Sequence, residues 1–170
     1  MESLDRSSNI EVSEIRQDPL RSVDRPEGQT IHKRKKVGSY VLHLDNVLGK
    51  GSFAKVYFGE KIGPSKSHFA QPAENKYAIK EIPNQTLMEK LGPRGQEALN
   101  KEIEISSILN HKHIVRLYDT IKTDKNNYLI FEFCGGGDLK SYLTEKRRLS
   151  EPVAQRFMHQ ICSGLQYLYC

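Results

Sequence analysis

The chain has 170 residues and a mass of 19.5 kDa, a length that suits one domain better than two. Apolar residues make up 37% and charged residues 28%, and no stretch approaches the roughly 18 consecutive apolar residues of a membrane-spanning helix. The net charge of +5 is mild, and the three cysteines, Cys134, Cys162 and Cys170, are too widely spaced for a disulfide framework or a zinc site. We therefore expect a cytoplasmic protein with no integral membrane segment and no nucleic-acid partner.

Residues 1–38 form a charged amino-terminal arm. They contain no aromatic residue, and eight Lys or Arg residues are mixed with seven Asp or Glu residues. Such a segment cannot bury enough apolar area to offset the entropy lost on ordering, so we expect it to be disordered. The basic run 33–36 at its end is most simply a solvated charge run, and a nuclear signal and a lipid-surface patch are the alternatives.

Three segments after this arm have the period-two alternation of β-strands, at residues 40–45, 54–58 and 77–82. Turns rather than helices join them, which indicates an antiparallel sheet. The polar stretch between residues 61 and 75 indicates a long loop, to which we assign no role.

The second half of the chain mixes helices and strands. Residues 93–110 predict a helix, and residues 114–118 and 128–131 predict two more strands. A short helix is expected from Asp138 and a longer one from near Ser150, where apolar residues recur every three or four positions. Five strands and three helices in this order predict an α+β fold.

The loop that follows Leu48 has the pattern G-x-G-x-x-A-x-V from Gly49 to Val56. Glycines let backbone N–H groups approach phosphate oxygens, although glycine pairs also mark ordinary hairpins. A dinucleotide-binding fold needs a helix directly after the glycines, and here a strand follows. A P-loop needs a Gly-Lys-Ser/Thr sequence that opens a helix, and this loop lacks that lysine.

Lys80 and Glu102 are the other candidate functional residues. Lys80 shares a strand face with Ala78 and Ile82, and a lysine on an inward face needs an anionic partner. The opposite assignment, with Tyr77 and Ile79 inside, is equally consistent with this strand alone. Glu102 shares a helix face with apolar residues and could be the partner of Lys80, although most helix glutamates are simply solvated.

These motifs, in this order, resemble the amino-terminal lobe of a eukaryotic protein kinase. The resemblance covers about residues 40–170, and it includes the glycine loop, Ala78-Ile79-Lys80, Glu102, the segment 111–115 and the segment 131–139 with its three glycines. The style of the loop and of the Gly-Gly-Gly-Asp-Leu segment is most similar to autophagy-initiating serine/threonine kinases. The resemblance implies a small lobe at 39–133, in which a five-stranded antiparallel sheet carries one main helix. It also implies a hinge at 132–137 and the first helices of the large lobe at 138–170.

The resemblance also implies site residues and cofactors. Lys80 would hold the α- and β-phosphates of ATP, and Glu102 would pair with Lys80 in the active helix position. The residues that would bind the nucleotide are Leu48, Gly49, Lys50, Gly51, Ser52, Phe53, Ala54, Val56, Ala78, Lys80, Phe131, Glu132, Cys134 and Asp138. Among these, Asp138 would approach the ribose, although a helix N-cap role suits it equally well. The partners would be ATP, Mg²⁺ and a protein substrate or regulatory protein.

Two departures from the family pattern are visible. Ser106 occupies a position one turn after Glu102 where the family more often has an apolar residue. The 170 residues contain no His-Arg-Asp and no Asp-Phe-Gly sequence, so the proton acceptor and the Mg²⁺ ligands are expected beyond Cys170. We therefore expect a fragment of a kinase that does not transfer phosphate by itself. The alternative is a non-catalytic binding module that engages a kinase or a regulator.

Overall fold

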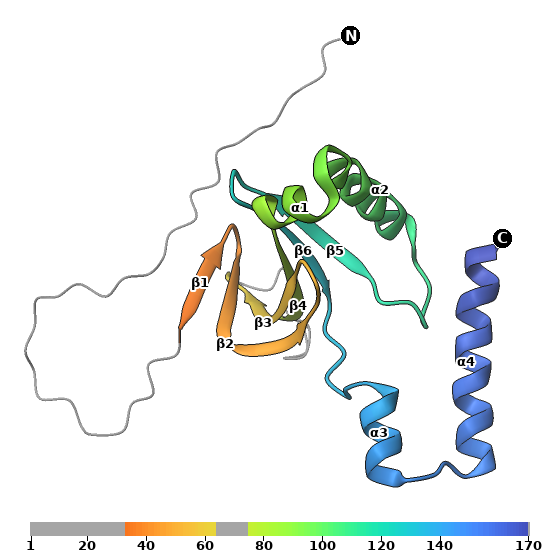
Figure 1. Cartoon of the computed structure of the whole chain (residues 1–170). Helices are drawn as coiled ribbons and strands as arrows, with labels where there is room; N and C mark the ends of the chain where they lie inside the picture. Colours follow the sequence, from red (N-terminus) through yellow and green to blue (C-terminus); the bar gives the residue numbers. More distant parts are fainter. Residues whose placement is uncertain (1–32, 64–74, 170) are drawn as a thin grey trace, which may run out of the picture.

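A computed structural model describes residues 33–63 and 75–169 (Figure 1). The described part contains a six-stranded sheet with strand order β1-β2-β3-β4-β6-β5, in which all neighbours are antiparallel. The strands are β1 (Arg34–Val37), β2 (Tyr40–Lys50), β3 (Lys55–Lys61), β4 (Lys76–Pro83), β5 (Leu117–Lys122) and β6 (Asn126–Glu132). The helical elements are α1 (Asn84–Leu91), the 3-10 turn η2 (Gly92–Arg94), α2 (Gly95–Ile108), α3 (Leu139–Lys146) and α4 (Glu151–Tyr169). The α+β prediction is confirmed, with one more strand than expected.

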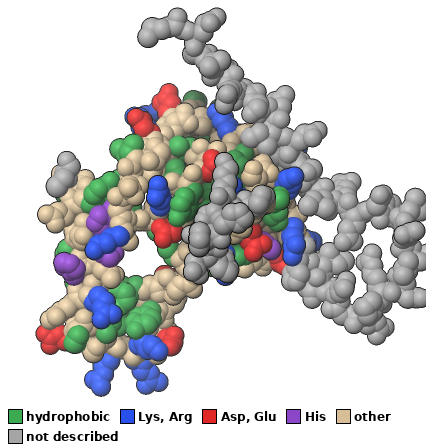
Figure 2. Space-filling view, turned by 180° about the vertical axis from the view of Figure 1, so that it is seen from behind, with side chains coloured by type: hydrophobic (Ala, Val, Ile, Leu, Met, Phe, Trp, Pro, Cys, Tyr) green, Lys and Arg blue, Asp and Glu red, His purple; other side chains and the backbone are tan. Residues whose placement is uncertain are grey.

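Helices α3 and α4 lie apart from the sheet, at the end of the segment that leaves β6 (Figure 1). The loop after α2 contacts α4: the Asn110 backbone N–H donates to the Tyr167 hydroxyl at 3.1 Å, and a ring nitrogen of His111 lies 3.2 Å from the Ser163 hydroxyl. Hydrophobic side chains are visible on the surface of this helical part in Figure 2. The apolar stripe expected on α4 is partly exposed, with Ile161 at 46% and Leu165 at 51%. None of the described helices is long and apolar enough to cross a membrane.

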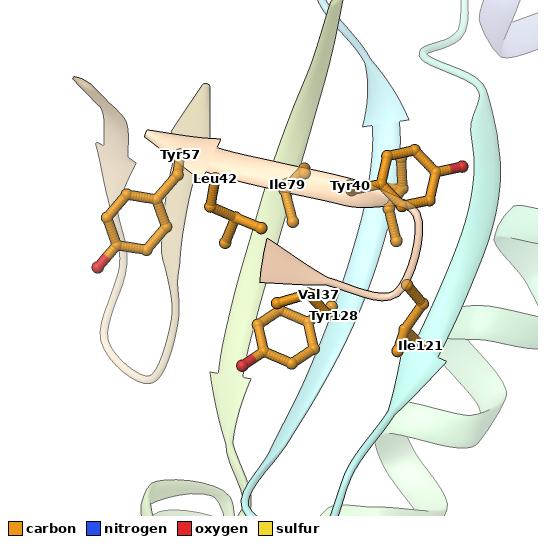
Figure 3. Close-up of a cluster of buried hydrophobic side chains, with 8 residues drawn as sticks. Val37, Tyr40, Leu42, Tyr57, Ile79, Ile121 and Tyr128 are labelled. Carbon is orange, nitrogen blue, oxygen red and sulfur yellow. The ribbon is translucent and has the colours of Figure 1, made fainter. Parts of the chain in front are cut away.

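The sheet is buried on both faces, so it has two cores. One cluster draws residues from all six strands, because the sheet curls and brings its first strand across the last two (Figure 3). Its buried members are Val37, Tyr40, Leu42, Tyr57, Ile79, Ile121, Tyr128 and Ile130. The second cluster packs the other face of the sheet against the helices, and its buried members are Ala54, Ile82, Leu87, Leu99 and Leu129. The two faces of β4 therefore serve different cores.

Strand β1 corrects the predicted extent of the disordered arm. We expected no structure before residue 39, but residues 34–37 pair with β2, and Val37 is 1% exposed. The basic run is not simply solvated, because Lys35 donates to Glu81 at 2.7 Å and lies over the Tyr128 ring. The segment has too few apolar residues to fold alone, and its ordering comes from partners distant in sequence. The part of the arm at 1–32 lies outside the described residues.

Other differences concern element boundaries. The helix expected at 93–110 runs from Gly95 to Ile108, and a separate helix, α1, precedes it where no helix was expected. The strand expected at 114–118 begins at Leu117 and runs to Lys122. Both helices expected in the last 33 residues are present, and the Asp138 carboxylate caps α3 by accepting from the Ser141 N–H at 2.6 Å. Most of the loop assigned to residues 61–75 lies outside the described residues.

Removal of the Lys35 ammonium should destabilise the fold. Its Glu81 partner is only 14% exposed at the side chain, so Lys35→Met leaves a largely buried carboxylate without its cation. We expect a loss of about 1–3 kcal/mol in the free energy of unfolding by urea. Lys36→Met is the matched control, because Lys36 is the exposed neighbour on the same strand and should change stability by less than about 0.5 kcal/mol. Equal stability of the two variants would contradict a structural role for the Lys35–Glu81 ion pair.

The stability contributed by Tyr40 should depend on pH. Burial, together with the Asp119 carboxylate that accepts from the hydroxyl at 3.1 Å, raises the pKa of Tyr40 above its ordinary value of 10.0. A raised pKa in the folded state stabilises the fold below pH 10.0, and this stabilisation is lost as the pH rises toward the folded-state pKa.

Tyr40→Phe should therefore be less stable than the wild type by about 1 kcal/mol at pH 8, where the hydrogen bond is intact. The difference should shrink as the pH is raised from 9 to 11.5, which denaturant unfolding at each pH would measure. Burial also raises the pKa of Tyr57 and Tyr128, but both proteins share these residues, so their effect cancels in the difference. A pH-independent difference would contradict the assignment.

Candidate functional site

Lys80 and Glu102 form an ion pair. The Lys80 Nζ donates to the Glu102 Oε1 at 2.6 Å, and the two side chains are 23% and 43% exposed. Lys80 lies on β4, and Glu102 lies on α2, one turn after the buried Leu99 that anchors this helix to the sheet. The pair that the sequence suggested is therefore present, and it remains open to solvent. Ser106, one turn further along α2, is half-buried.

Both assignments of the β4 faces that the sequence left open are partly right. Ile79 is fully buried in the cluster beneath β1, and Ile82 is 1% exposed in the cluster beneath the helices. Lys80 shares the face of Ile82, so it points to the side of the sheet that carries α2. The alternation alone could not decide, because neither face of this strand is solvated.

The glycine loop connects β2 to β3 and joins Lys80 through the sheet register. Gly49 pairs with Val56, Val56 pairs with Lys80, and these three residues form one cross-strand row. Within the loop, the Gly51 N–H donates to the Ala54 carbonyl at 2.9 Å. Phe53 packs against the cluster that contains the buried Ala54, so the end of the loop is fastened to the second core.

Nothing in the described residues requires glycine at 49 or 51. Neither residue has a positive φ. A Cβ built on Gly49 meets no described atom within 4 Å, and one on Gly51 meets only the Ala54 carbonyl at an ordinary 3.7 Å. Gly59 is different, because its Cβ would lie 2.3 Å from Ile79 Cδ1. The loop glycines thus leave open space beside the backbone, whereas Gly59 is required by packing.

The residues expected around the base lie next to this row. Ala78 pairs with Phe131, and both are half-buried. The chain then leaves β6 through Glu132, whose N–H donates to the Arg116 carbonyl at 2.9 Å, and through the exposed Cys134. Burial and the nearby Glu132 raise the pKa of the Cys134 thiol, so this cysteine is not an activated nucleophile.

The remaining predicted residues are placed as follows. Leu48 is 42% exposed at the start of the loop, and Lys50 pairs with Lys55 where β2 meets β3. Asp138 caps α3, and the hydrogen bond from Ser141 lowers the pKa of its carboxyl. Its N-cap role is confirmed, and a role at the ribose stays a prediction.

Ser52 takes part in a contact that the sequence did not predict. Its backbone carbonyl accepts a hydrogen bond from the Lys90 ammonium of α1.

No metal site accompanies these residues. The described ranges contain no group of three or more His, Cys, Asp or Glu side chains placed to hold a metal ion. The described side chains therefore do not form a metal site by themselves, and the Mg²⁺ that accompanies ATP throughout the family would rest mainly on the phosphates and on other ligands.

Comparison with known proteins decides the family. A family model described as protein kinase domain matches residues 42–170. The chain belongs to the protein kinase family. The serine/threonine-protein kinase ATG1a of Arabidopsis thaliana is 36% identical over 132 residues, which are 78% of this chain and 19% of that relative. The serine/threonine-protein kinase PLK2 of Rattus norvegicus is 36% identical over 124 residues, 72% of this chain and 16% of that relative.

A third relative, the carbon catabolite-derepressing protein kinase of Secale cereale, is 35% identical over 130 residues, which are 75% of this chain and 24% of that relative. The chain thus spans between 16% and 24% of the length of these three relatives. It corresponds to the amino-terminal part of the kinase domain, which agrees with the resemblance seen in the sequence.

Alanine substitutions at Gly59 and Gly49 should distinguish a glycine that packing requires from a glycine that leaves room for a ligand. Gly59→Ala overpacks the core against Ile79 and should cost about 1–3 kcal/mol of unfolding free energy. Gly49→Ala enters open space and should change stability by less than about 0.5 kcal/mol in the same thermal or urea unfolding experiment. Similar destabilisation by both substitutions would show that Gly49 has a structural role instead.

Proposed function

We propose that this chain is the ATP-binding part of a serine/threonine protein kinase. The complete reaction would transfer the γ-phosphoryl group of ATP to a hydroxyl of a protein substrate. The observation that carries this proposal is the row Gly49, Val56 and Lys80, which ends at the ion pair with Glu102. This row combines a glycine loop that has open space beside its backbone with a lysine that an ion pair holds in place.

Lys80 is suited to bind phosphate because its ammonium is held in place and remains partly exposed to solvent. The Glu102 carboxylate holds the ammonium in place, and both side chains stay partly exposed, so a polyphosphate can reach it. Exposed ion pairs contribute only about 0–1 kcal/mol to stability, so the role of this pair in folding is small. We propose that Lys80 contacts the α- and β-phosphates and that Glu102 orients it.

The nucleotide base would lie beside the row of Ala78 and Phe131. Leu48, Val56 and Ala78 would pack on the adenine ring, and the backbone of Glu132 and Cys134 would hydrogen-bond its edge. Phe131 would limit access to the space behind the base, and Asp138 would approach the ribose. The half-buried state of Val56, Ala78 and Phe131 supports this proposal, because apolar side chains that are neither sealed in a core nor fully solvated suit an aromatic ligand.

The chain's own residues would position ATP rather than complete the transfer. The 170 residues contain neither a His-Arg-Asp nor an Asp-Phe-Gly sequence, and the described residues hold no metal cluster. The relatives compared above are named as kinases and do not support the alternative of a non-catalytic binding module.

A role in autophagy and a cytoplasmic location remain proposals. Two relatives are ATG1 kinases, from Arabidopsis thaliana and Dictyostelium discoideum, and each is 36% identical to this chain. PLK2 of Rattus norvegicus is also 36% identical, so identity does not separate the subfamilies. The sequence style of the glycine loop and of the three-glycine segment supports the ATG1 assignment.

Lys80→Met should weaken ATP binding by the 170-residue chain about 10- to 100-fold, because the charge-assisted hydrogen bonds to phosphate are lost. The binding of a fluorescent ATP analogue, displaced by unlabelled ATP, would measure this effect. Lys76→Met removes an exposed lysine from the start of the same strand and should leave the affinity unchanged within about twofold. Equal affinities of the wild type and Lys80→Met would contradict the proposed site.

A further inference from the structure

Helix α1 contacts the tip of the glycine loop. The Lys90 Nζ, in the last turn of α1, donates a hydrogen bond to the Ser52 carbonyl. Lys90 and Ser52 are 38 residues apart in the sequence, so the contact depends on the fold. A carbonyl and the following N–H of a trans peptide point in opposite directions. The bond to Lys90 therefore directs the Phe53 N–H to the side of the loop away from α1.

The position of α1 relative to the loop is fixed by packing. Leu87, three residues before Lys90, is 4% exposed and belongs to the cluster that contains Ala54 and contacts Phe53. Residues three apart share a helix face, so Leu87 and Lys90 both lie on the loop side of α1. The loop thus contacts α1 at two places. Phe53 and Ala54 at its end share an apolar cluster with Leu87, and the Ser52 carbonyl at its tip accepts a hydrogen bond from Lys90.

Helix α1 is in turn fixed to α2, the helix that carries Glu102. A Cβ built on Gly95, the first residue of α2, would lie 3.0 Å from the Leu87 carbonyl and 3.1 Å from the Leu91 Cβ. The backbones of the two helices therefore approach closely, and a side chain at position 95 would require its neighbours to shift by a few tenths of an ångström. We therefore expect a shift of α2 that changes the distance from Glu102 to Lys80 to move α1 and its contact with the loop as well.

We propose that Lys90 is a positioning residue that holds the glycine loop in the conformation that covers the nucleotide phosphates. Its bond to Ser52 turns the Phe53 N–H toward the bound anion, and the close contact at Gly95 links loop position to the Lys80–Glu102 pair. The inference rests on the proposed nucleotide-binding function. It extends the site to a helix that contributes none of the residues predicted from the sequence.

The test combines a measurement without nucleotide and one with it. Amide hydrogen exchange of the loop peptide 49–54 without nucleotide should be about three- to tenfold faster in Lys90→Met than in the wild type. ATP affinity should fall about three- to tenfold, whereas adenosine affinity should change by less than about twofold, because the loop covers phosphates only. Lys90→Arg keeps a cationic donor and should restore most of both effects. Lys101→Met, which removes an exposed lysine of α2, should change neither.

Each outcome separates the inference from the function on which it rests. Unchanged loop exchange and unchanged ATP affinity in Lys90→Met would overturn the role of Lys90, while a Lys80→Met defect would leave the nucleotide site standing. Equal losses of ATP and adenosine affinity would also overturn it, because they would indicate a general structural effect. Wild-type chain that shows no ATP binding would overturn the nucleotide function itself, and the positioning role of Lys90 with it.

Discussion

Strand β4 is buried on both faces, and this constraint organises the rest of the molecule. Ile79 and Ile82 face opposite cores, and between them lie two adjacent residues of opposite charge, Lys80 and Glu81. A charge on a covered sheet face is costly unless it is paired. The chain meets this requirement with one partner on each side: Glu102 of α2 pairs with Lys80, and Lys35 of β1 pairs with Glu81.

The two ion pairs differ in solvent exposure, and the difference indicates which pair serves mainly to stabilise the fold and which is suited to bind a ligand. The Lys35 and Glu81 side chains are 18% and 14% exposed, and the Tyr128 hydroxyl also donates to the Glu81 carboxylate. Burial alone lowers the pKa of Lys35, but its hydrogen bonds with Glu81 and Tyr128 outweigh that effect and raise it. Lys80 and Glu102, at 23% and 43%, are the more exposed pair. This greater exposure supports the proposal that the Lys80 ammonium, and not that of Lys35, binds a phosphate.

Local patterns predicted most of the sheet and both residues of the central ion pair. Alternation identified β2, β3 and β4, and the segment 128–131 was also predicted as a strand and lies within β6. A chain of motifs in order identified Lys80 and Glu102. The sequence could not decide which face of β4 carries Lys80, because alternation assigns a face only where the opposite one is polar. It missed β1 because the stabilisation of that strand comes from Ile121 and Tyr128, which lie more than 80 residues away.

Helix α1 shows a second limit of local patterns. Its eight residues contain only three apolar side chains, and of these Leu87 is buried while Met88 and Leu91 are exposed. A single buried residue produces no periodicity, so nothing in this segment predicts a helix that packs on the glycine loop. Lys90 is equally ordinary in the sequence, where a lysine in a last helical turn is explained by the helix dipole alone. Its contact with Ser52 becomes visible only when the fold brings the loop and the helix together.

The contrast between glycines shows how structure can narrow the function of a loop. A glycine is explained inside a protein by a positive φ or by a close approach of other atoms, and Gly59 and Gly95 meet the second condition. Gly49 and Gly51 meet neither condition, although each glycine adds conformational entropy that folding must overcome. The described residues therefore give no packing or conformational reason for these two glycines. A bound anion that needs close backbone approach supplies such a reason, and the lysine in the same cross-strand row supplies the charge that selects it.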